Sequence, residues 1–339
     1  LKKNKNFRFK KFDLKNNITY KFLGKKNFKF IFHLAAQPGV RFSVSDPKRY
    51  IDENILAFTK VLEFARSQKC LCTFFASSSS VYGDSKKFPI NEDMELKPKN
   101  VYGLTKKFNE ELAYFYSENF KMKLVCLRFF TVFGPWGRPD MLILKLLDKV
   151  KSKKTFQVNN FGNHTRDFTY IDDVTNMIFS LFLKYKKIKM FDYFNLCSNN
   201  PINLMKIINH IVKRAGKTKL KRVKFQKADV YKTHGSNKKI LKLIKYRKFN
   251  DISYIVRKQY AKFSNWVDMV TVHSLVSTDV VSKLSGVLLV ANMSNNDYDF
   301  TEAHGSQDHL RVGMRKKEFA ASREPSMALF RSIRISIFV

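Results

Sequence analysis

Three apolar runs separated by amphipathic segments constrain the fold of this chain more than any other feature of its sequence. The runs are FKFIFHLAA (28–36), CLCTFFASSSSVYG (70–83) and KLVCLRFFTVFG (123–134), and each ends in small or polar residues. Such runs are typical of strands buried on both faces of a sheet. Strands that alternate with helices predict a parallel sheet joined by right-handed crossovers. We therefore expect an α/β fold.

The segments between these strands have the pattern of amphipathic helices. At the start of the first segment, Asp46 stands at the N-cap position and Pro47 at the first helical position, and apolar residues then recur with helical spacing. A second helix is expected from about Val101. Because ligands gather beyond the carboxyl ends of parallel strands, residues 33–37, 77–80 and 131–134 should line one crevice.

After residue 134 the pattern becomes mixed and less regular, as expected of a smaller lobe that closes over a substrate. We expect a loop and helix in 135–154, a helix with an acidic start in 166–185, and a short strand, turn and capped helix in 193–217. From about residue 268 the composition changes abruptly, because lysine becomes rare and periodicity is poor.

The net charge of +36 suggests a nucleic-acid partner, but its distribution does not favour one. Residues 268–339 carry eight Lys or Arg and eight Asp or Glu, so the whole excess is spread over residues 1–267, mostly as lysine. Nucleic-acid readers instead cluster arginine and display aromatic side chains on a binding face. We therefore expect no specific nucleic-acid partner.

Two further features of the composition bear on the class of protein. No apolar run approaches the roughly 20 residues of a membrane-spanning helix. The four cysteines show no disulfide or metal-binding spacing, so we expect them to be reduced and mostly buried, in a cytoplasmic protein without a bound metal.

Tyr102 and Lys106 stand four residues apart at the start of the second helix, so their side chains share one helix face. An ammonium held near a phenol favours the phenolate and lowers its pKa, which is one way to make a base near neutral pH. The same spacing also fits a solvated helix face in a lysine-rich chain. Both interpretations stay open on the spacing alone.

Several segments together resemble one enzyme family. HLAAQPGVRFS resembles the strand-end cofactor signature of extended short-chain dehydrogenases/reductases in the NAD-dependent nucleotide-sugar epimerase branch, and ASSSSVYG followed by YGLTK resembles their Ser…Tyr-x-x-x-Lys catalytic set. LRFFTVFGPWGRPDM and RDFTYIDDV are similar to segments of UDP-glucuronate 4-epimerases. The resemblance extends over residues 10–267. It implies a Rossmann-like doubly wound parallel sheet with a smaller mixed α/β substrate lobe.

The resemblance also implies a division of the chain. We expect a partial NAD-binding Rossmann domain in 1–133, a UDP-sugar lobe in 134–267 that is interleaved with it, and an unassigned tail in 268–339. The family opens with a strand and a G-x-x-G-x-x-G turn that lets the backbone approach the cofactor pyrophosphate. We find neither, and the resemblance then places the start of this sequence roughly 50–60 residues into the fold. We expect the lack of this strand to expose an apolar sheet edge.

The catalytic roles follow from the resemblance. Tyr102 would take the proton from the sugar 4-hydroxyl, and Lys106 would hold the nicotinamide ribose and keep Tyr102 acidic. Ser78 would hydrogen-bond the reacting oxygen, with Ser79 and Ser80 as rivals within the serine run. Related dehydratases and decarboxylases carry a carboxylate where Ser79 and Ser80 stand, so elimination and decarboxylation are disfavoured.

The resemblance further implies binding residues. For the cofactor these are Asp13, which would contact the adenine amino group, and Leu34, Ala35, Ala36 and Asn54. For the substrate they are Arg138 with Thr131 at the C6 carboxylate, Arg166 at the phosphates, and Gln226 and Asp229 at the nucleotide and ribose. Core packing of residues 34–36 and a structural role of Arg138 in a tight turn are the alternatives.

The function implied is the NAD-dependent 4-epimerisation of a UDP-sugar, with UDP-glucuronate converted to UDP-galacturonate through a transient 4-keto intermediate, for surface polysaccharide. The helices in 47–68 and 101–120 would form the interface of a homodimer. The alternatives are a UDP-hexose 4-epimerase, a UDP-glucuronate decarboxylase, and an inactive gene fragment of this family that lacks the phosphate-binding turn.

Overall fold

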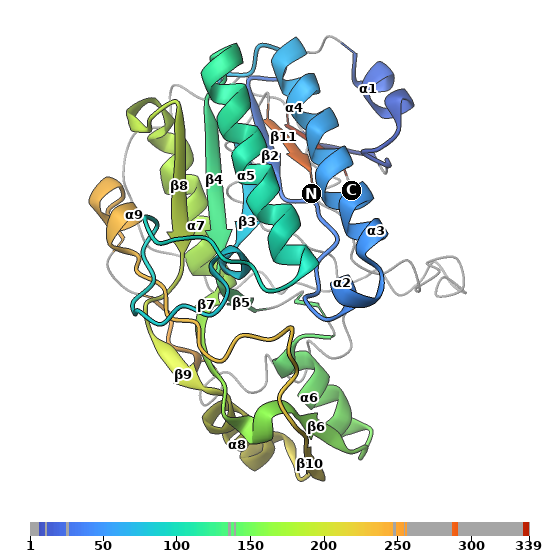
Figure 1. The fold of residues 1–339 in the computed structure, drawn as a ribbon, viewed down its shortest axis with the longest axis vertical. Helices are drawn as coiled ribbons and strands as arrows, with labels where there is room; N and C mark the ends of the chain where they lie inside the picture. The colour runs from blue at the N-terminus through green and yellow to red at the C-terminus, as the bar shows by residue number, and fades with distance from the viewer. Residues whose placement is uncertain are drawn as a thin grey trace, which may run out of the picture.

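A parallel sheet forms the centre of the fold in a computed structural model, which describes residues 7–10, 12–24, 27–134, 137–138, 140–246, 249–253, 255, 287–290 and 335–338 (Figure 1). Within the described residues the sheet has seven strands, and every adjacent pair is parallel. Their order is β1 (Phe7–Lys10), β12 (Ile335–Phe338), β11 (Val287–Val290), β2 (Phe30–His33), β3 (Cys72–Ser78), β4 (Leu124–Phe129) and β8 (Phe191–Leu196). The predicted α/β class is confirmed.

The expectation of an exposed sheet edge beside β2 is wrong. Val287 pairs with Phe30 and Val290 with His33, so β11 satisfies the backbone groups on that side of β2. β12 lies between β11 and β1 and pairs with both. Both added strands come from residues 268–339, the segment that the sequence analysis left unassigned. Their sequences, VLLV and ISIF, are short apolar runs of the kind that suits a strand within a sheet.

Helices cover both faces of the sheet (Figure 1). On one face lie α4 (Ala57–Ser67) and α5 (Val101–Phe120), and Phe75 and Leu124 of the sheet belong to the same apolar cluster as their buried residues. On the other lies α7 (Ile171–Leu183), which shares a cluster with Phe74 and Val125. Adjacent strand residues thus face opposite helix layers. The doubly wound arrangement is confirmed.

The helices that precede the site begin as the sequence predicts. The Asp46 side chain accepts a hydrogen bond from the amide of Arg49 at 3.2 Å, and Pro47 follows it. The helical segment then continues through α3 (Pro47–Tyr50) and a π-helical stretch, η1 (Ile51–Leu56), into α4. α5 begins after Asn100, whose side chain accepts from the amide of Gly103 at 2.8 Å. Short helices α1 (Asn17–Leu23) and α2 (Phe42–Ser45) flank β2.

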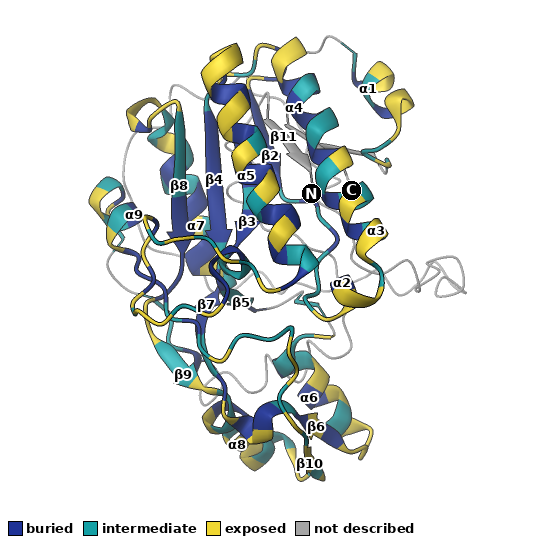
Figure 2. Ribbon diagram, viewed as in Figure 1, coloured by how far each residue is buried: buried dark blue, intermediate teal, exposed yellow. Residues whose placement is uncertain are grey.

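A smaller mixed lobe lies below the sheet in the view of Figure 1, and its apolar side chains form a separate core (Figure 2). Its elements are α6 (Leu142–Lys151), β6 (Phe156–Val158), η3 (Asn159–Gly162), α8 (Leu204–Ala215) and β10 (Leu220–Arg222). A second small sheet of β5 (Thr131–Phe133), β7 (Thr165–Tyr170) and β9 (Pro201–Asn203) connects it to the central sheet. The remaining elements are η2 (Ser79–Tyr82), η4 (Tyr185–Lys187) and α9 (Lys238–Leu243).

The helix expected over 166–185 is wrong in its first part. Residues Thr165–Tyr170 form β7, and the helix α7 begins only at Ile171. β7 pairs with β5 on one side and β9 on the other, so its conformation depends on partners more than 25 residues away in the sequence. The periodicity of residues 165–170 alone does not reveal that this segment pairs with β5 and β9.

The four cysteines are free, and Cys72, Cys126 and Cys197 are buried. Among the described residues, no helix combines the length and the apolar character needed to cross a bilayer. In the same part of the chain, no group of three or more His, Cys, Asp or Glu is arranged to hold a metal ion.

Candidate active site

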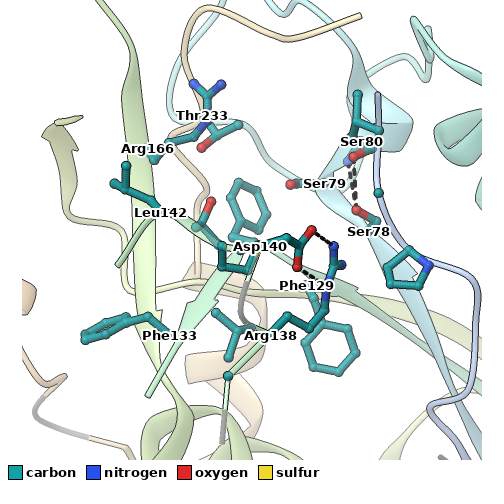
Figure 3. A pocket seen from close by; sticks show the side chains of 18 of the residues that line it. Ser78, Ser79, Ser80, Phe129, Phe133, Arg138, Asp140, Leu142, Arg166 and Thr233 are labelled. Carbon is teal, nitrogen blue, oxygen red and sulfur yellow. Dashed lines mark hydrogen bonds and ion pairs between the residues drawn. The ribbon is translucent and has the colours of Figure 1, made fainter. Parts of the chain in front are cut away.

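A cavity of about 750 Å³ lies beyond the carboxyl ends of β2, β3 and β4, and residues of the smaller lobe form its other wall. Figure 3 shows part of its lining, with the serine run on one side and Arg138, Asp140 and Arg166 on the other. The strand exits contribute Leu34 and Ala36, residues 77–80, and residues 129–134. The predicted meeting of three strand ends at one crevice is confirmed, because parallel strands point their carboxyl ends to one edge.

Tyr102 is held at the wall of this cavity by the start of α5. Its side chain lies close enough to that of Ser78 for Ser78 to act on the Tyr102 pKa, and both residues line the cavity. Its ring packs edge-on against the ring of Tyr50, with centroids 6.3 Å apart. Tyr50 is itself buried, and its hydroxyl lies 2.7 Å from the carbonyl oxygen of Pro38 and 2.6 Å from that of Gly39. These contacts fix the direction in which the Tyr102 phenol points.

The pKa of Tyr102 differs from the sequence-based expectation. Burial raises it above its ordinary value, while the side chain of Ser78 and the charge of Arg138 act in the opposite direction without cancelling the effect of burial. The expectation of a lowered pKa is therefore wrong for this structure. The physical reason is that removing the phenolate from water outweighs the positive charges nearby.

Lys106 lies one turn after Tyr102 and faces the same cavity. Its ammonium is 6.0 Å from the centroid of the Tyr102 ring and donates a hydrogen bond to the carbonyl oxygen of Ala76 at 2.8 Å. Burial lowers the pKa of Lys106 to about 8. The described residues thus supply one acceptor to a group with three donors. The two side chains converge at the serine-lined exit, so the solvated-face interpretation of the Tyr-x-x-x-Lys spacing is wrong.

The serine run forms a compact turn where β3 ends. Ser78 caps η2, since its hydroxyl oxygen accepts from the amide of Ser80 at 3.2 Å and lies 3.2 Å from the Ser80 hydroxyl. Ser78, Ser79 and Ser80 all line the cavity (Figure 3). Of the three, Ser78 is the one whose side chain lowers the pKa of Tyr102, although burial outweighs this effect. This favours Ser78 over its two neighbours as the partner of the phenol.

Arg138 lies in the cavity wall together with Thr131. Its guanidinium binds the carboxylate of Asp140 with two parallel contacts, one of them between Nε and Oδ1 at 2.9 Å (Figure 3). A bidentate pair of this kind is the geometry in which guanidinium recognises a carboxylate. Arg138 thus faces the cavity and is placed to contact a ligand. The carboxylate of Asp140, from the same loop, already binds its guanidinium.

Arg166 and Asp229 also line the cavity, and both are engaged by the protein. Arg166 donates to the carbonyl oxygens of Val230 at 2.6 Å and Tyr231 at 3.0 Å, and burial lowers its pKa to about 10. The Asp229 carboxylate accepts two hydrogen bonds from Arg41, the shorter at 2.7 Å. These contacts fasten the loop around Asp229 across the cavity. Arg41 stands inside the strand-end segment HLAAQPGVRFS, but the sequence pattern alone did not single it out.

Four of the predicted binding residues do not line the cavity: Asp13, Ala35, Asn54 and Gln226. Asp13 is exposed and accepts from the amide of Lys15 in a local turn. Ala35 is buried in the apolar cluster beneath α4, which agrees with its core-packing alternative. Gln226 is exposed.

Asn54 has a supporting place behind the cavity. It is buried, accepts from the amide of Gln37 at 2.7 Å and donates to the carbonyl oxygen of Gln37 at 3.1 Å and to Thr105 at 3.0 Å. These contacts join the exit of β2 to the first turn of α5. Asn54 therefore holds the backbone that leads into the cavity wall.

The cavity residues fit the dinucleotide cofactor that the resemblance implies. A volume of about 750 Å³ is within the usual range of ligand sites. The buried ammonium of Lys106 donates one hydrogen bond to Ala76, so among the described residues its other N–H groups are available to a ligand hydroxyl. The small side chain of Ala36 lets a ligand approach the exit of β2. Leu34, Ala36 and Lys106 are thus the residues that would hold NAD.

Comparison with known proteins agrees with these observations. The sequence is 35% identical over 254 residues to Protein CapI of Staphylococcus aureus, covering 68% of this chain and 75% of that protein. It is 32% identical over 256 residues to a probable UDP-glucuronate 4-epimerase of Rhizobium meliloti (strain 1021), covering 70% and 74%. The structure is similar to that of UDP-glucuronic acid 4-epimerase from Bacillus cereus in complex with UDP-glucuronic acid and NAD, with a TM-score of 0.72, 29% identity, and coverage of 78% and 83%.

Two sequence families match parts of the chain. The orotidine 5'-phosphate decarboxylase / HUMPS family matches residues 211–321, most of which lie outside the described residues. The NAD dependent epimerase/dehydratase family matches residues 1–197, which include the strand exits, Tyr102 and Lys106. This second match covers more than half of the sequence, and the chain therefore belongs to the NAD dependent epimerase/dehydratase family.

Proposed function

We propose that this chain is an NAD-dependent nucleotide-sugar 4-epimerase and that its substrate is UDP-glucuronate. The observation that carries the proposal is the convergence of Tyr102, Lys106 and Ser78 at one wall of the cavity, with the Lys106 ammonium 6.0 Å from the centroid of the Tyr102 ring. A phenol, a neighbouring ammonium and a hydroxyl at a strand exit are the groups needed to move a proton to and from a sugar hydroxyl.

Each of these residues has a defined task. Tyr102 as phenolate accepts the proton of the sugar 4-hydroxyl, and Ser78 hydrogen-bonds the same oxygen. Lys106 would donate to the ribose hydroxyls of the cofactor, with the donors that its bond to Ala76 leaves over. NAD, held by Leu34, Ala36 and Lys106, would supply a reversible hydride acceptor for sugar C4. Tyr102 holds the proton of the 4-hydroxyl while the sugar is in its 4-keto form and then gives it back to O4.

Two observations favour an acidic sugar. The Bacillus cereus relative binds UDP-glucuronic acid, and here Arg138 and Thr131 stand in the cavity wall, where a guanidinium and a hydroxyl suit a carboxylate. Ser79 and Ser80 carry no carboxylate for additional acid–base chemistry, which disfavours decarboxylation. Asp13 and Gln226 stay proposed contacts of the cofactor adenine and the substrate nucleotide, respectively.

The function is tested by incubating the full chain with NAD and either UDP-glucuronate or UDP-glucose, and following the sugar products by NMR. We expect UDP-galacturonate from UDP-glucuronate without loss of carbon dioxide. Turnover of UDP-glucose alone would instead identify an epimerase of neutral sugars. Equilibrium dialysis with NAD in the same samples separates these outcomes from the inactive alternative, which predicts no NAD uptake.

Replacing Arg138 by Ala is expected to raise the KM for UDP-glucuronate about 10- to 100-fold, the range for loss of hydrogen bonds to a charged group. The KM for any residual turnover of UDP-glucose should not change, because that sugar has no carboxylate. The exposed Arg66, which pairs with Glu63 on α4, provides the control substitution Arg66→Ala. An equal loss for both sugars would contradict the carboxylate contact and favour a structural role in the turn.

We further propose that the chain forms a homodimer through α5 and the helical segment before α4. Their outer faces expose large apolar side chains: Leu104 56%, Phe108 43%, Phe115 52%, Ile51 49% and Leu56 43%. Contiguous exposed apolar patches of this kind mark protein–protein interfaces. Sedimentation velocity should show a dimer that the substitution Leu104→Asp converts to a monomer. A monomeric wild-type chain would contradict this interface.

A further inference from the structure

A buried chain of charge-assisted hydrogen bonds connects β4, α5 and β3 directly behind the serine exit. Arg128 of β4 donates to Glu110 of α5 through Nε at 3.0 Å and through a terminal nitrogen at 2.7 Å. Ser77 of β3 donates to the same carboxylate at 2.5 Å. All three side chains are buried, with exposed fractions of 2–4%. A paired carboxylate in such surroundings is held in one position.

Glu110 lies on the same face of α5 as Tyr102 and Lys106, the proposed catalytic pair. Tyr102, Lys106 and Glu110 are spaced one turn apart along α5, and they contact three consecutive residues of β3. Lys106 donates to the carbonyl oxygen of Ala76, Glu110 accepts from the hydroxyl of Ser77, and Tyr102 lies near the side chain of Ser78. Tyr102 and Lys106 line the cavity, whereas Glu110 does not and is anchored to Arg128. The contact between Glu110 and Arg128 therefore sets the positions of Tyr102 and Lys106.

The charges around Lys106 give Glu110 a second role. The titratable groups that face the ammonium are His33 from β2, Cys126 from β4, and Tyr102 and Glu110 from α5; β4 also carries Arg128, which is bound to Glu110. Burial and Lys106 lower the pKa of His33 to about 3, so it is neutral near pH 7. Burial keeps Cys126 a neutral thiol, because its pKa is raised. Glu110 stands one turn after Lys106 on α5 and is the carboxylate of this group, with Arg128 bound to it at 2.7 Å.

We propose that Glu110 is a positioning residue: through Ser77 it fixes the exit of β3 beside Tyr102, and it supplies the negative charge that stabilises the buried ammonium of Lys106. Glu110 touches neither substrate nor cofactor and acts through its neighbours. The inference rests on the proposed function only for its kinetic consequence. The charge on Lys106 is a property of the chain itself and is measured without substrate.

The charge is tested in the full chain by competitive labelling with acetic anhydride over a pH series, with individual lysines quantified by peptide mass spectrometry. In the wild type the labelling of Lys106 should have its midpoint at about pH 8. Glu110→Gln should lower this midpoint by about one unit, because a neighbouring charge shifts a pKa by one unit or more. The matched variant Glu111→Gln removes an exposed carboxylate of the same helix, the partner of Lys107, and should leave the Lys106 midpoint unchanged, with the exposed Lys86 as the internal reference. A folded Glu110→Gln chain with the wild-type midpoint would overturn the proposal.

The position of the strand exit is tested with variants that keep the ion pair. Ser77→Ala should lower kcat for UDP-glucuronate about tenfold with KM unchanged, because the exit of β3 beside Tyr102 loses its hydrogen bond to Glu110 and misplaced catalytic groups slow the reaction. Ser77→Thr retains a hydroxyl and should restore kcat. Ser117→Ala is the control, because Ser117 is buried on α5 and its hydroxyl has no hydrogen-bond partner among the described residues.

The two experiments separate failure of this inference from failure of the proposed function. If Glu110→Gln does not fold, the Ser77 series decides: wild-type kcat in Ser77→Ala, or a Ser77→Thr as impaired as Ser77→Ala, would overturn the proposal. If the wild-type chain turns over neither sugar, the proposed function fails. The Ser77 series is then read from the labelling rate of Lys106, which should rise in Ser77→Ala alone as the exit of β3 loosens.

Discussion

Replacing Tyr102 by Phe is expected to lower kcat for epimerisation by a factor of about 10² to 10⁴, the range for loss of a positioned general acid–base group. Phe keeps the ring that packs against Tyr50 and removes only the hydroxyl that lies near Ser78. NAD uptake should therefore be retained. The measurement is kcat by NMR of the sugar products, with NAD binding by equilibrium dialysis on the same preparation.

Tyr114→Phe is the matched control for this prediction. Tyr114 lies on the same helix, is 53% exposed, and is remote from the cavity lining. Its substitution should leave kcat unchanged. If Tyr102→Phe retains wild-type activity, another group accepts the proton and the assignment of Tyr102 as the base is wrong.

Replacing Arg128 by Met is expected to destabilise the fold by about 3–5 kcal/mol, because it leaves the buried carboxylate of Glu110 without its cation. Arg128 also donates to the Tyr82 hydroxyl at 2.8 Å and to the carbonyl oxygen of Glu92 at 3.0 Å, so these acceptors lose their partner too. Urea unfolding followed by circular dichroism should show a large decrease in the midpoint.

An exposed ion pair provides the comparison. Arg66 contacts Glu63 at 2.6 Å on the surface of α4, and Arg66→Met should cost about 1 kcal/mol or less. The double substitution Arg128→Met with Glu110→Leu removes both buried charges and should recover much of the lost stability. Equal effects of Arg128→Met and Arg66→Met would contradict the importance of the buried network.

The sequence predicted well those features that depend on local pattern. Buried apolar runs located β2, β3 and β4, and Asp46 with Pro47 located a helix start, because strand burial and helix capping leave their mark on neighbouring residues. The parallel topology then required the strand exits to meet. For this reason the serine run could be placed at a crevice from topology, whereas the resemblance of ASSSSVYG and YGLTK to the catalytic set of the family placed Tyr102 and Lys106 beside it.

Features that depend on distant partners were missed. β7 is a strand because it pairs with β5 and β9. β2 pairs with residues 287–290, which are distant in the sequence. Asp13, Ala35 and Asn54 lie outside the cavity lining, and their contacts with the cofactor stay predictions. Asn54 supports the exit of β2, a role that requires knowing what lies opposite its side chain.

The sequence by itself determined the order of strands and helices in the first half of the chain and the placement of a phenol and an ammonium on one helix face, because both follow from spacing along a single segment. The tertiary structure alone decided the electrostatics of the site. The raised pKa of Tyr102, the pairing of Arg138 with Asp140, and the anchoring of Glu110 by Arg128 all depend on burial and on groups brought together from different elements. Burial and long-range contact are properties of the packed chain, and residue spacing does not encode them directly.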